Sequence, residues 1–297
     1  MGIDTAHYHG WSGPLRSPWF ACLAIVRVAL LQVFRRKSYW VVLALGLLNF
    51  LLFWSIIYGV TQFQIPREFQ EELLEGFGFS SQPAAGRDSG YINFMSRQSI
   101  VVMILLAFSG SLLVGADFRM SSLPFYLSRR IDRRHYIVGK LLAVSVVVSL
   151  LTTVPALLLF IEYGVFTSSL DYWRNNWHVV ISVLVYGAVL CAVMSIWLVT
   201  LSAYLQRMAP IAITWSSLFV MLGSMARWLS EGRENIYWHL LDPWRDMRYV
   251  GKLCFGAEFE SGDERLVAWW ALAILVATCV VAVVALVHRV RAVDVVE

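Results

Sequence analysis

Apolar residues along this chain are gathered in long runs rather than in short alternating or helical repeats. Six runs contain no Asp, Glu, Lys or Arg, and a helix needs about 20 mostly apolar residues to cross the hydrocarbon core of a bilayer. The runs are residues 39–60, 99–116, 141–161, 177–204, 208–226 and 266–287. Because an ionised side chain at mid-bilayer is costly, these runs predict six transmembrane helices. The second run is the shortest and can extend upstream through Phe94 and Met95.

A shorter apolar stretch, residues 19–34, precedes these runs. It contains Arg27 and is followed at once by three more basic residues. This pattern predicts an amphipathic helix that lies in the plane of the membrane interface. The chain would then consist of an N-terminal segment, residues 1–38, and one six-helix domain, residues 39–297. The alternative is a seventh span, which would place the N-terminal segment on the opposite side of the membrane.

The composition agrees with a membrane protein. Apolar residues make up 59% of the chain and charged residues only 15%, with a mean hydropathy of +0.65, whereas soluble domains carry roughly 25% charged residues. The four cysteines lack the spacing of a zinc site or a disulfide framework, so we expect no metal site. A net charge of +4 does not indicate a nucleic-acid partner. We therefore expect an all-α polytopic membrane protein whose surroundings are the lipid bilayer.

Basic residues are divided unequally between the two sides that six spans define. The side that collects both termini, the 117–140 loop and the turn at 205–207 holds 14 basic and 5 acidic residues, and the other side holds 10 basic and 15 acidic residues. By the positive-inside rule, both termini are expected to be cytoplasmic. The expected location is the bacterial cytoplasmic (inner) membrane, with the chain as an integral multi-pass protein.

The spans offer no constellation for catalysis or ion coupling, and no GxxxxGK[ST] motif for nucleotide phosphates occurs in the chain. We therefore expect a non-catalytic chain with no cofactor of its own. Pro155 is interpreted as a simple kink in the third span, and Glu162, at the end of that span, as a solvated residue. Two stripes of small residues could form a dimer seam or pack inside one bundle: Ala107, Ser111 and Gly115, and Gly187, Cys191 and Ser195.

The 117–140 loop contains six basic side chains, but it also carries apolar residues between them. Leu123, Phe125, Tyr126, Leu127 and Ile131 alternate with serines, arginines and Asp132. Binding to anionic lipid would account for the arginines alone. The interleaved apolar residues favour a short helix that presents both kinds of side chain to a groove on a partner protein.

The same loop resembles the signature loop of ABC-2 type transporter permeases. The matching motifs are Asp117-x-Arg119, Ser122-Leu123, Leu127-Ser128, Ile131-Asp132-Arg133 and Tyr136-x-x-Gly139-Lys140. The resemblance extends to the N-terminal helix, the six spans and the long segment before the last span. The loop departs from the family pattern at Ser121-Ser122, where Gly-Thr is common, at Arg130, where Pro is common, and at Asp132, where Ser is common.

The resemblance implies that this chain is the permease subunit of an ATP-driven exporter. ATP-Mg would be bound and hydrolysed by a separate cytoplasmic ABC ATPase, and the transport pathway would lie between two permease subunits in a homodimer or heterodimer. The alternative is an ATP-independent membrane protein, either a secondary carrier or a structural subunit. The residues that would couple the chain to the ATPase are Asp117, Arg119, Leu123, Phe125, Tyr126, Leu127, Ser128, Arg129, Arg130, Ile131, Asp132 and Arg133.

The segment between the fifth and sixth spans is aromatic but too interrupted by charge to cross the membrane, as short interfacial or re-entrant helices are. The resemblance implies that these helices cap the pathway on the outer side. The cap would be formed by Tyr237, Trp238, Leu241, Pro243 and Trp244, and the alternative is ordinary contact with the interface. In the 61–98 loop, an amphipathic helix is expected to carry Glu68, Glu71, Glu72 and Glu75.

Overall fold

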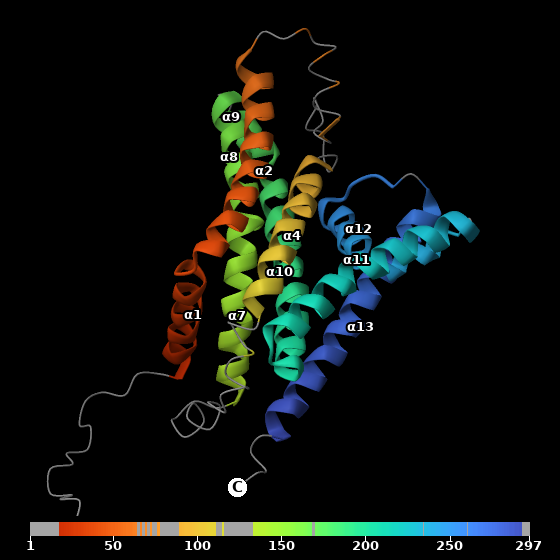
Figure 1. The fold of residues 1–297 in the computed structure, drawn as a ribbon. Helices are drawn as coiled ribbons and strands as arrows, with labels where there is room; N and C mark the ends of the chain where they lie inside the picture. The colour runs from red at the N-terminus through yellow and green to blue at the C-terminus, as the bar shows by residue number, and fades with distance from the viewer. Residues whose placement is uncertain are drawn as a thin grey trace, which may run out of the picture.

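The computed structural model describes residues 18–63, 89–110, 115, 133–167, 170–233, 235–259 and 261–292, together with Pro66, Phe69, Glu72, Gly76 and Phe77. The regular elements in this part of the chain are helices (Figure 1). They are α1 (Pro18–Phe34), α2 (Lys37–Gln62), α4 (Ser89–Gly110), α7 (Arg133–Leu151), α8 (Thr153–Thr167), α9 (Leu170–Asn175), α10 (Trp177–Leu205), α11 (Met208–Arg233), the 3-10 helix η3 (Ile236–Leu241), α12 (Pro243–Phe255) and α13 (Gly262–Ala292).

Six helical segments are long and apolar enough to cross a membrane, which confirms the predicted number of spans. They are Tyr39–Gln62, Gly90–Gly110, Arg133–Phe166, Trp177–Leu205, Met208–Arg233 and Gly262–Val290. Much of their apolar surface faces outward, as it does in a bundle surrounded by lipid: Leu48, Val220 and Val281 are examples of exposed side chains on three different spans. The chain is an all-α polytopic membrane protein.

Three spans begin earlier than the apolar runs predict, and the sixth does so by a single turn, at Gly262. The second begins at Gly90 and therefore includes Arg97, whose guanidinium carbon lies 5.7 Å from the centroid of the Phe53 ring and 5.5 Å from that of Phe77. Aromatic faces attract a cation placed within about 6 Å, so the two rings stabilise this arginine within the helix. A search for runs without charged residues stops at Arg97 and therefore misses the first part of this span. The third begins at Arg133 because the basic end of the preceding loop is already helical.

The third span is broken at Thr152, between α7 and α8 (Figure 1). Pro155 has no N–H to donate to the carbonyl of Leu151, and its ring would clash with that carbonyl in a regular helix. The Thr152 hydroxyl donates to the carbonyl oxygen of Val148 at 2.8 Å, and the Thr152 carbonyl accepts from Ala156 N–H at 3.1 Å. The kink predicted at Pro155 is therefore a one-residue interruption that keeps the direction of the span.

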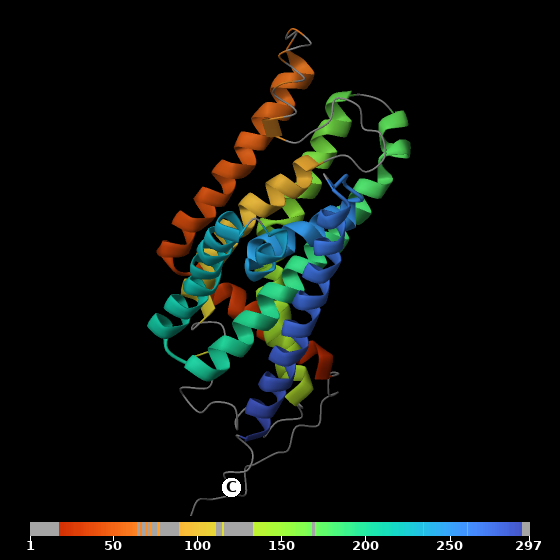
Figure 2. The same cartoon turned by 90° about the vertical axis from the view of Figure 1, so that its right-hand side faces the viewer.

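We call the end of the bundle where α13 ends the terminal end, and the opposite end the distal end. Helix α1 lies at the terminal end, where it crosses the start of α7 obliquely (Figures 1 and 2). It buries Cys22, Ile25, Ala29 and Val33, whose three- and four-residue spacing places them on one face. Its other side exposes mostly apolar side chains, together with Arg27.

Helix α10 occupies the centre of the bundle and contacts α4, α7, α8, α11, α12 and α13. The second small-residue stripe lies on its buried side. A Cβ atom on Gly187 would clash directly with Thr153 at the start of α8, the Cys191 thiol donates to the carbonyl of Ser145, and Ser195 is buried. Ala107 and Gly115 of the first stripe are also buried within the bundle, and Ser111 lies outside the described residues. Both stripes thus pack inside one bundle, as far as they are described.

A pair of amides links α2 to α4 and carries our first prediction. Asn49 donates to Gln98 Oε1 at 2.7 Å, and Gln98 donates to the carbonyl of Gly46 at 3.2 Å. Hydrogen bonds between membrane helices contribute about 0.6 kcal/mol on average and up to about 1.7 kcal/mol. A double-mutant cycle of Asn49→Leu and Gln98→Leu, followed by thermal unfolding, should give a coupling in this range.

The matched control for that cycle is Ser55→Ala, because the Ser55 hydroxyl bonds only to a carbonyl of its own helix, that of Leu52. This variant should leave the unfolding midpoint unchanged. Strict additivity of Asn49→Leu and Gln98→Leu would contradict a stabilising link between α2 and α4.

Candidate functional site

The segment between the fifth and sixth spans folds into two short helices whose starts are fixed by side-chain caps. Asn235 Oδ1 accepts the N–H of Tyr237 at 2.9 Å at the start of η3, and Asp242 Oδ1 accepts the N–H of Trp244 at 3.0 Å at the start of α12. Pro243 occupies the first turn of α12, where its missing N–H costs nothing. Gly256 ends the helix with a φ of 62°, a conformation that favours glycine.

Helix α12 is inserted among the spans rather than lying over them. It contacts α4, α10, α11 and α13, and Figure 2 shows it between α11 and α13. Gly251 permits this approach, because a Cβ atom there would lie 2.9 Å from the Tyr186 ring of α10. Phe255 packs with the rings of Tyr91 and Tyr186, at centroid distances of 6.4 and 6.2 Å. The segment is thus a re-entrant helix held by the distal half of the bundle.

Two polar contacts attach α12 to its neighbours. Arg248 donates to Asn93 Oδ1 of α4 at 2.8 Å, and Lys252 Nζ lies 2.6 Å from Glu264 Oε1 at the start of α13. Both partners of the second contact are largely buried, which reduces screening by water. These contacts fix both the position of α12 along the bundle axis and its rotation about its own axis.

The residues predicted to form an outer cap are divided between two environments. Tyr237 is exposed, and Trp238 is half-buried beneath the Arg233 guanidinium, which lies 5.3 Å from its ring centroid. Leu241 and Pro243 line a pocket inside the bundle. Trp244 packs on Phe219 of α11 with a centroid distance of 4.8 Å. Their role as a cap over a transport pathway stays a prediction.

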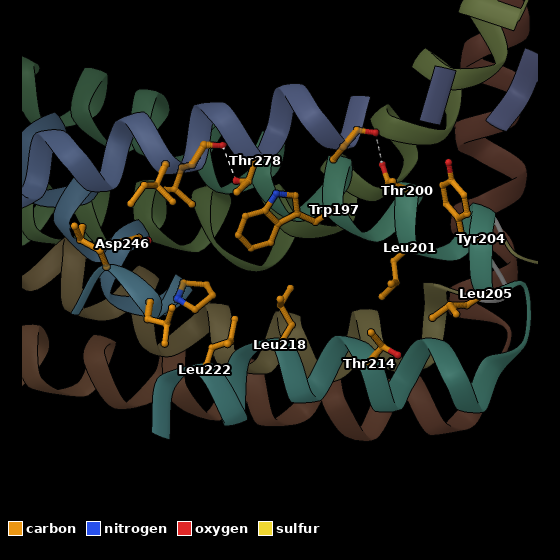
Figure 3. Close-up of a pocket in the computed structure, with 16 residues that line it drawn as sticks. Trp197, Thr200, Leu201, Tyr204, Leu205, Thr214, Leu218, Leu222, Asp246 and Thr278 are labelled. Atoms are coloured by element: carbon orange, nitrogen blue, oxygen red, sulfur yellow. Dashed lines mark hydrogen bonds between the residues drawn. The ribbon is translucent and has the colours of Figure 1, made fainter. Parts of the chain in front are cut away.

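The pocket has a volume of about 560 Å³ and lies between α10, α11 and α13, with η3 and α12 at one end (Figure 3). Its walls are aliphatic and aromatic, with Trp197 and Leu201 on one side and Leu218 and Leu222 on the other. Leu275 of α13 completes the wall. The volume falls within the roughly 300–1,000 Å³ range of small-molecule sites.

Three of the hydroxyl groups in the pocket wall donate to the backbone. Thr200 donates to the carbonyl of Ala282 at 3.1 Å, Tyr204 to that of Ala285 at 3.0 Å, and Thr278 to that of Leu275 at 3.0 Å. A hydroxyl that donates to the backbone has no proton left for a ligand, so these three side chains can only accept a hydrogen bond from one.

Asp246 of α12 also lines this pocket (Figure 3). Its side chain is only 2% exposed, and its Oδ1 atom has no hydrogen-bond partner among the described residues. Burial raises the pKa of this carboxyl from 3.8 to about 8, with a smaller contribution from the negative charge of Asp242. A buried carboxyl without a partner, beside an apolar cavity, is an arrangement that occurs at functional sites.

Most of the predicted ATPase-coupling residues fall outside the described residues. This holds for Asp117, Arg119, Leu123, Phe125, Tyr126, Leu127, Ser128, Arg129, Arg130, Ile131 and Asp132. Arg133 is described as the exposed first residue of α7. In the 61–98 loop, Glu72 is helical and exposed, and Glu68, Glu71 and Glu75 lie outside the described residues.

The end of the signature motif is described, and it forms the contact between α7 and α1. Cys22 of α1 donates to the carbonyl of His135 at 3.2 Å, and the rings of Trp19 and His135 meet edge to face at 4.8 Å. Gly139 allows α1 to approach, because a Cβ atom there would lie 3.0 Å from Ile25. The loop is therefore followed directly by a helix, α7, whose first turns pack against α1.

Tyr136 and Lys140 of the same motif are buried one turn apart on α7. Tyr136 is 2% exposed and Lys140 is 7% exposed. The ammonium nitrogen of Lys140 lies 5.8 Å from the centroid of the Tyr136 ring, a cation–π contact that offsets part of the cost of burial. The Tyr-x-x-Gly-Lys pattern thus has a structural role in seating α7 at the terminal end.

Sequence reasoning missed two buried carboxyl groups. Glu162, interpreted above as solvated, is buried on α8, and neither of its carboxylate oxygens has a partner in the described part of the chain. Asp246 was counted only as an acidic residue of a loop. The sequence does contain a signal for the burial of Asp246. Asp242-Pro243 predicts the start of a helix. On that helix Asp246 shares one face with the apolar residues Pro243, Met247 and Val250.

The described residues contain no group of three or more His, Cys, Asp or Glu side chains that could hold a metal ion. Asp246 has a single neighbouring carboxylate in Asp242, which is already engaged as the cap of α12. The arrangement around the pocket therefore suits binding of an organic molecule better than metal coordination.

The chain was compared with known proteins and protein families. The comparison with curated proteins finds no match. The sequence matches the family described as "Protein of unknown function (DUF2705)" over residues 59–296, which include the second to sixth spans, the basic loop, η3 and α12. The chain belongs to this family.

Proposed function

We propose that this chain is the membrane-spanning permease subunit of an ABC-2 type transporter that works as an exporter. ATP-Mg is bound and hydrolysed by a separate cytoplasmic ABC ATPase, and the chain acts with a second permease subunit. In this proposal the terminal end of the bundle is cytoplasmic, the membrane is the bacterial inner membrane, and the chain itself is not an enzyme.

The observation that carries the proposal is the arrangement of the basic loop between the second and third spans. The loop combines basic and apolar side chains, and it leads into Tyr136-x-x-Gly139-Lys140, which is packed against α1. A force applied to the loop by a partner is therefore transmitted to α7 and α1 together. A loop that served only to fix topology would need the charges but not this seating.

The distal half of the bundle supports the same proposal. The segment between the fifth and sixth spans forms the short helices η3 and α12, and short helices in this segment are what the resemblance implies. The residues proposed to couple to the ATPase are those of the loop from Asp117 to Arg133. The residues proposed to cap the pathway are Tyr237, Trp238, Leu241, Pro243 and Trp244.

The test is co-purification of the full chain with the ABC ATPase encoded beside it. The triple variant Leu127→Ala, Arg129→Ala and Arg133→Ala is expected to lose most of the bound ATPase, because it removes one apolar anchor and two charges. The amount of ATPase per permease, and the ATPase rate of the purified complex, are the measurements.

The matched control replaces Arg174, Arg265 and Leu266 with alanine, since these have the same residue types, and both arginines and the leucine are exposed. This control should keep the bound ATPase. Retention of ATPase by the loop variant would overturn the assignment of the coupling residues. If the wild-type chain purifies without any ATPase, the ATP-independent carrier or structural subunit becomes the better reading.

A further inference from the structure

We propose that the pocket between α10, α11 and α13 binds a hydrophobic amine, a molecule with one hydrocarbon chain and one positively charged head, and that Asp246 receives the head. This inference does not rest on the proposed function, because one chain builds the whole pocket and no ATPase is involved. It assigns a ligand class and a binding role for Asp246, a residue that the resemblance does not mark.

The shape of the pocket suits a single hydrocarbon chain. Its wall runs from Trp197 to Leu205 on α10 and from Ile274 to Ala282 on α13. At 1.5 Å per residue each stretch is about 12 Å long. The slot is therefore elongated along the helices, and three of its hydroxyl groups donate to backbone carbonyls. Such a lining attracts a chain of methylene groups and carries no charged side chain along its length before Asp246.

One end of the slot provides the polar partner. Asp246 is 98% buried at the α12 end, and its Oδ1 atom has no partner among the described residues. The neighbouring carboxylate, Asp242, adds negative charge. An ammonium group placed there would favour the ionised form of Asp246 and would donate a charge-assisted hydrogen bond to the resulting carboxylate.

The sign of the charge excludes the other common amphiphiles. A fatty acid or another anionic amphiphile would not favour ionisation of Asp246, and its negative head would lie near the Asp242 carboxylate, which is unfavourable in a buried site. A fatty alcohol would fit the slot but would form only a neutral hydrogen bond, which is roughly half as strong as a charge-assisted one. The pocket therefore discriminates by head group among chains of equal length.

The experiment compares three probes of equal chain length on the full chain in phosphatidylcholine nanodiscs. The probes are dodecylamine, dodecanol and dodecanoate, and binding is measured by equilibrium competition against radiolabelled dodecylamine, with empty nanodiscs as background. The wild-type chain should bind the amine about tenfold more tightly than the alcohol, and the carboxylate should be the weakest competitor. In Asp246→Asn, the amine and the alcohol should compete equally.

Two further variants keep the result interpretable. Asp263→Asn removes an exposed carboxylate outside the pocket and should leave the preference for the amine unchanged. Thr214→Trp fills the slot from an exposed wall position and should weaken amine and alcohol alike, which gives a second test if the Asp246 variant does not fold. Equal binding of amine and alcohol to the wild type, a preference for the amine that survives in Asp246→Asn, or amine binding that is as tight in Thr214→Trp as in the wild type would overturn the proposal.

Discussion

Replacement of Gly187 by leucine is expected to prevent the third and fourth spans from packing and to give a protein that is poorly inserted or easily unfolded. Gly187 lies on α10 against the start of α8, where even a Cβ atom would overlap the Thr153 side chain. Thr153 follows the break at Thr152, so α8 cannot move aside without disturbing the bonds around that break. Overpacking of a close contact costs typically 1–3 kcal/mol and occasionally more.

At that cost, the apparent midpoint of thermal unfolding should fall by about 2–5 °C for a chain of this size. The measurement is thermal unfolding of the purified chain, together with the yield in the membrane fraction. The neighbouring Ala188 is exposed on the same helix, so Ala188→Leu adds the same bulk without the clash and should behave as wild type. A Gly187→Leu protein that matches Ala188→Leu in both measurements would refute the close contact between α8 and α10.

Replacement of Asp246 by asparagine is expected to stabilise the chain near neutral pH and to have little effect in acid. The folded chain holds this carboxyl protonated up to its raised pKa of about 8, while the unfolded chain releases the proton near the ordinary pKa of 3.8. Between these values the folded state binds more protons, so the stability due to Asp246 falls as the pH rises and becomes constant above about pH 8.

A shift from 3.8 to about 8 corresponds to a lost stability of up to about 6 kcal/mol, at 1.36 kcal/mol per pKa unit. Asparagine has nearly the same shape and no charge to bury, so the difference between the variant and the wild type should grow from pH 5 to pH 8. Unfolding midpoints at half-unit pH steps test this, with Asp263→Asn as the carboxylate control. A difference that is independent of pH would show that Asp246 is not buried as an acid.

The spans were predictable because a membrane favours the same property along the whole of a span, namely apolar side chains without charge. A charge-free run long enough to cross is rare by chance, so each of the six runs identified a helix. The start of α4 was not predictable in this way, because the charge of Arg97 is accommodated by the Phe53 and Phe77 rings. These contacts join residues that are far apart in the sequence, and a local window does not contain them.

The candidate site was predictable only in part. The sequence indicates short helices between the fifth and sixth spans, and the structure contains them as η3 and α12. It does not indicate that α12 enters the bundle, since this depends on Gly251 meeting Tyr186, a contact between distant residues. The burial of Asp246 follows from that insertion. A count of charges treats such a carboxyl as solvated, which is the same error as the one made for Glu162.

The ion pair between Lys252 and Glu264 has a mechanical consequence. It joins the last turn of α12 to the first turn of α13 across a short connection, and the two helices also pack extensively on each other. The Asp246 carboxyl is therefore held in place relative to the start of α13, and a shift of α12 along α13 would break this pair. Helix α11, the wall on the other side of the slot, packs on both η3 and α12. The end of the slot that holds Asp246 is thus braced from both walls, while its far end has no such crosspiece among the described contacts.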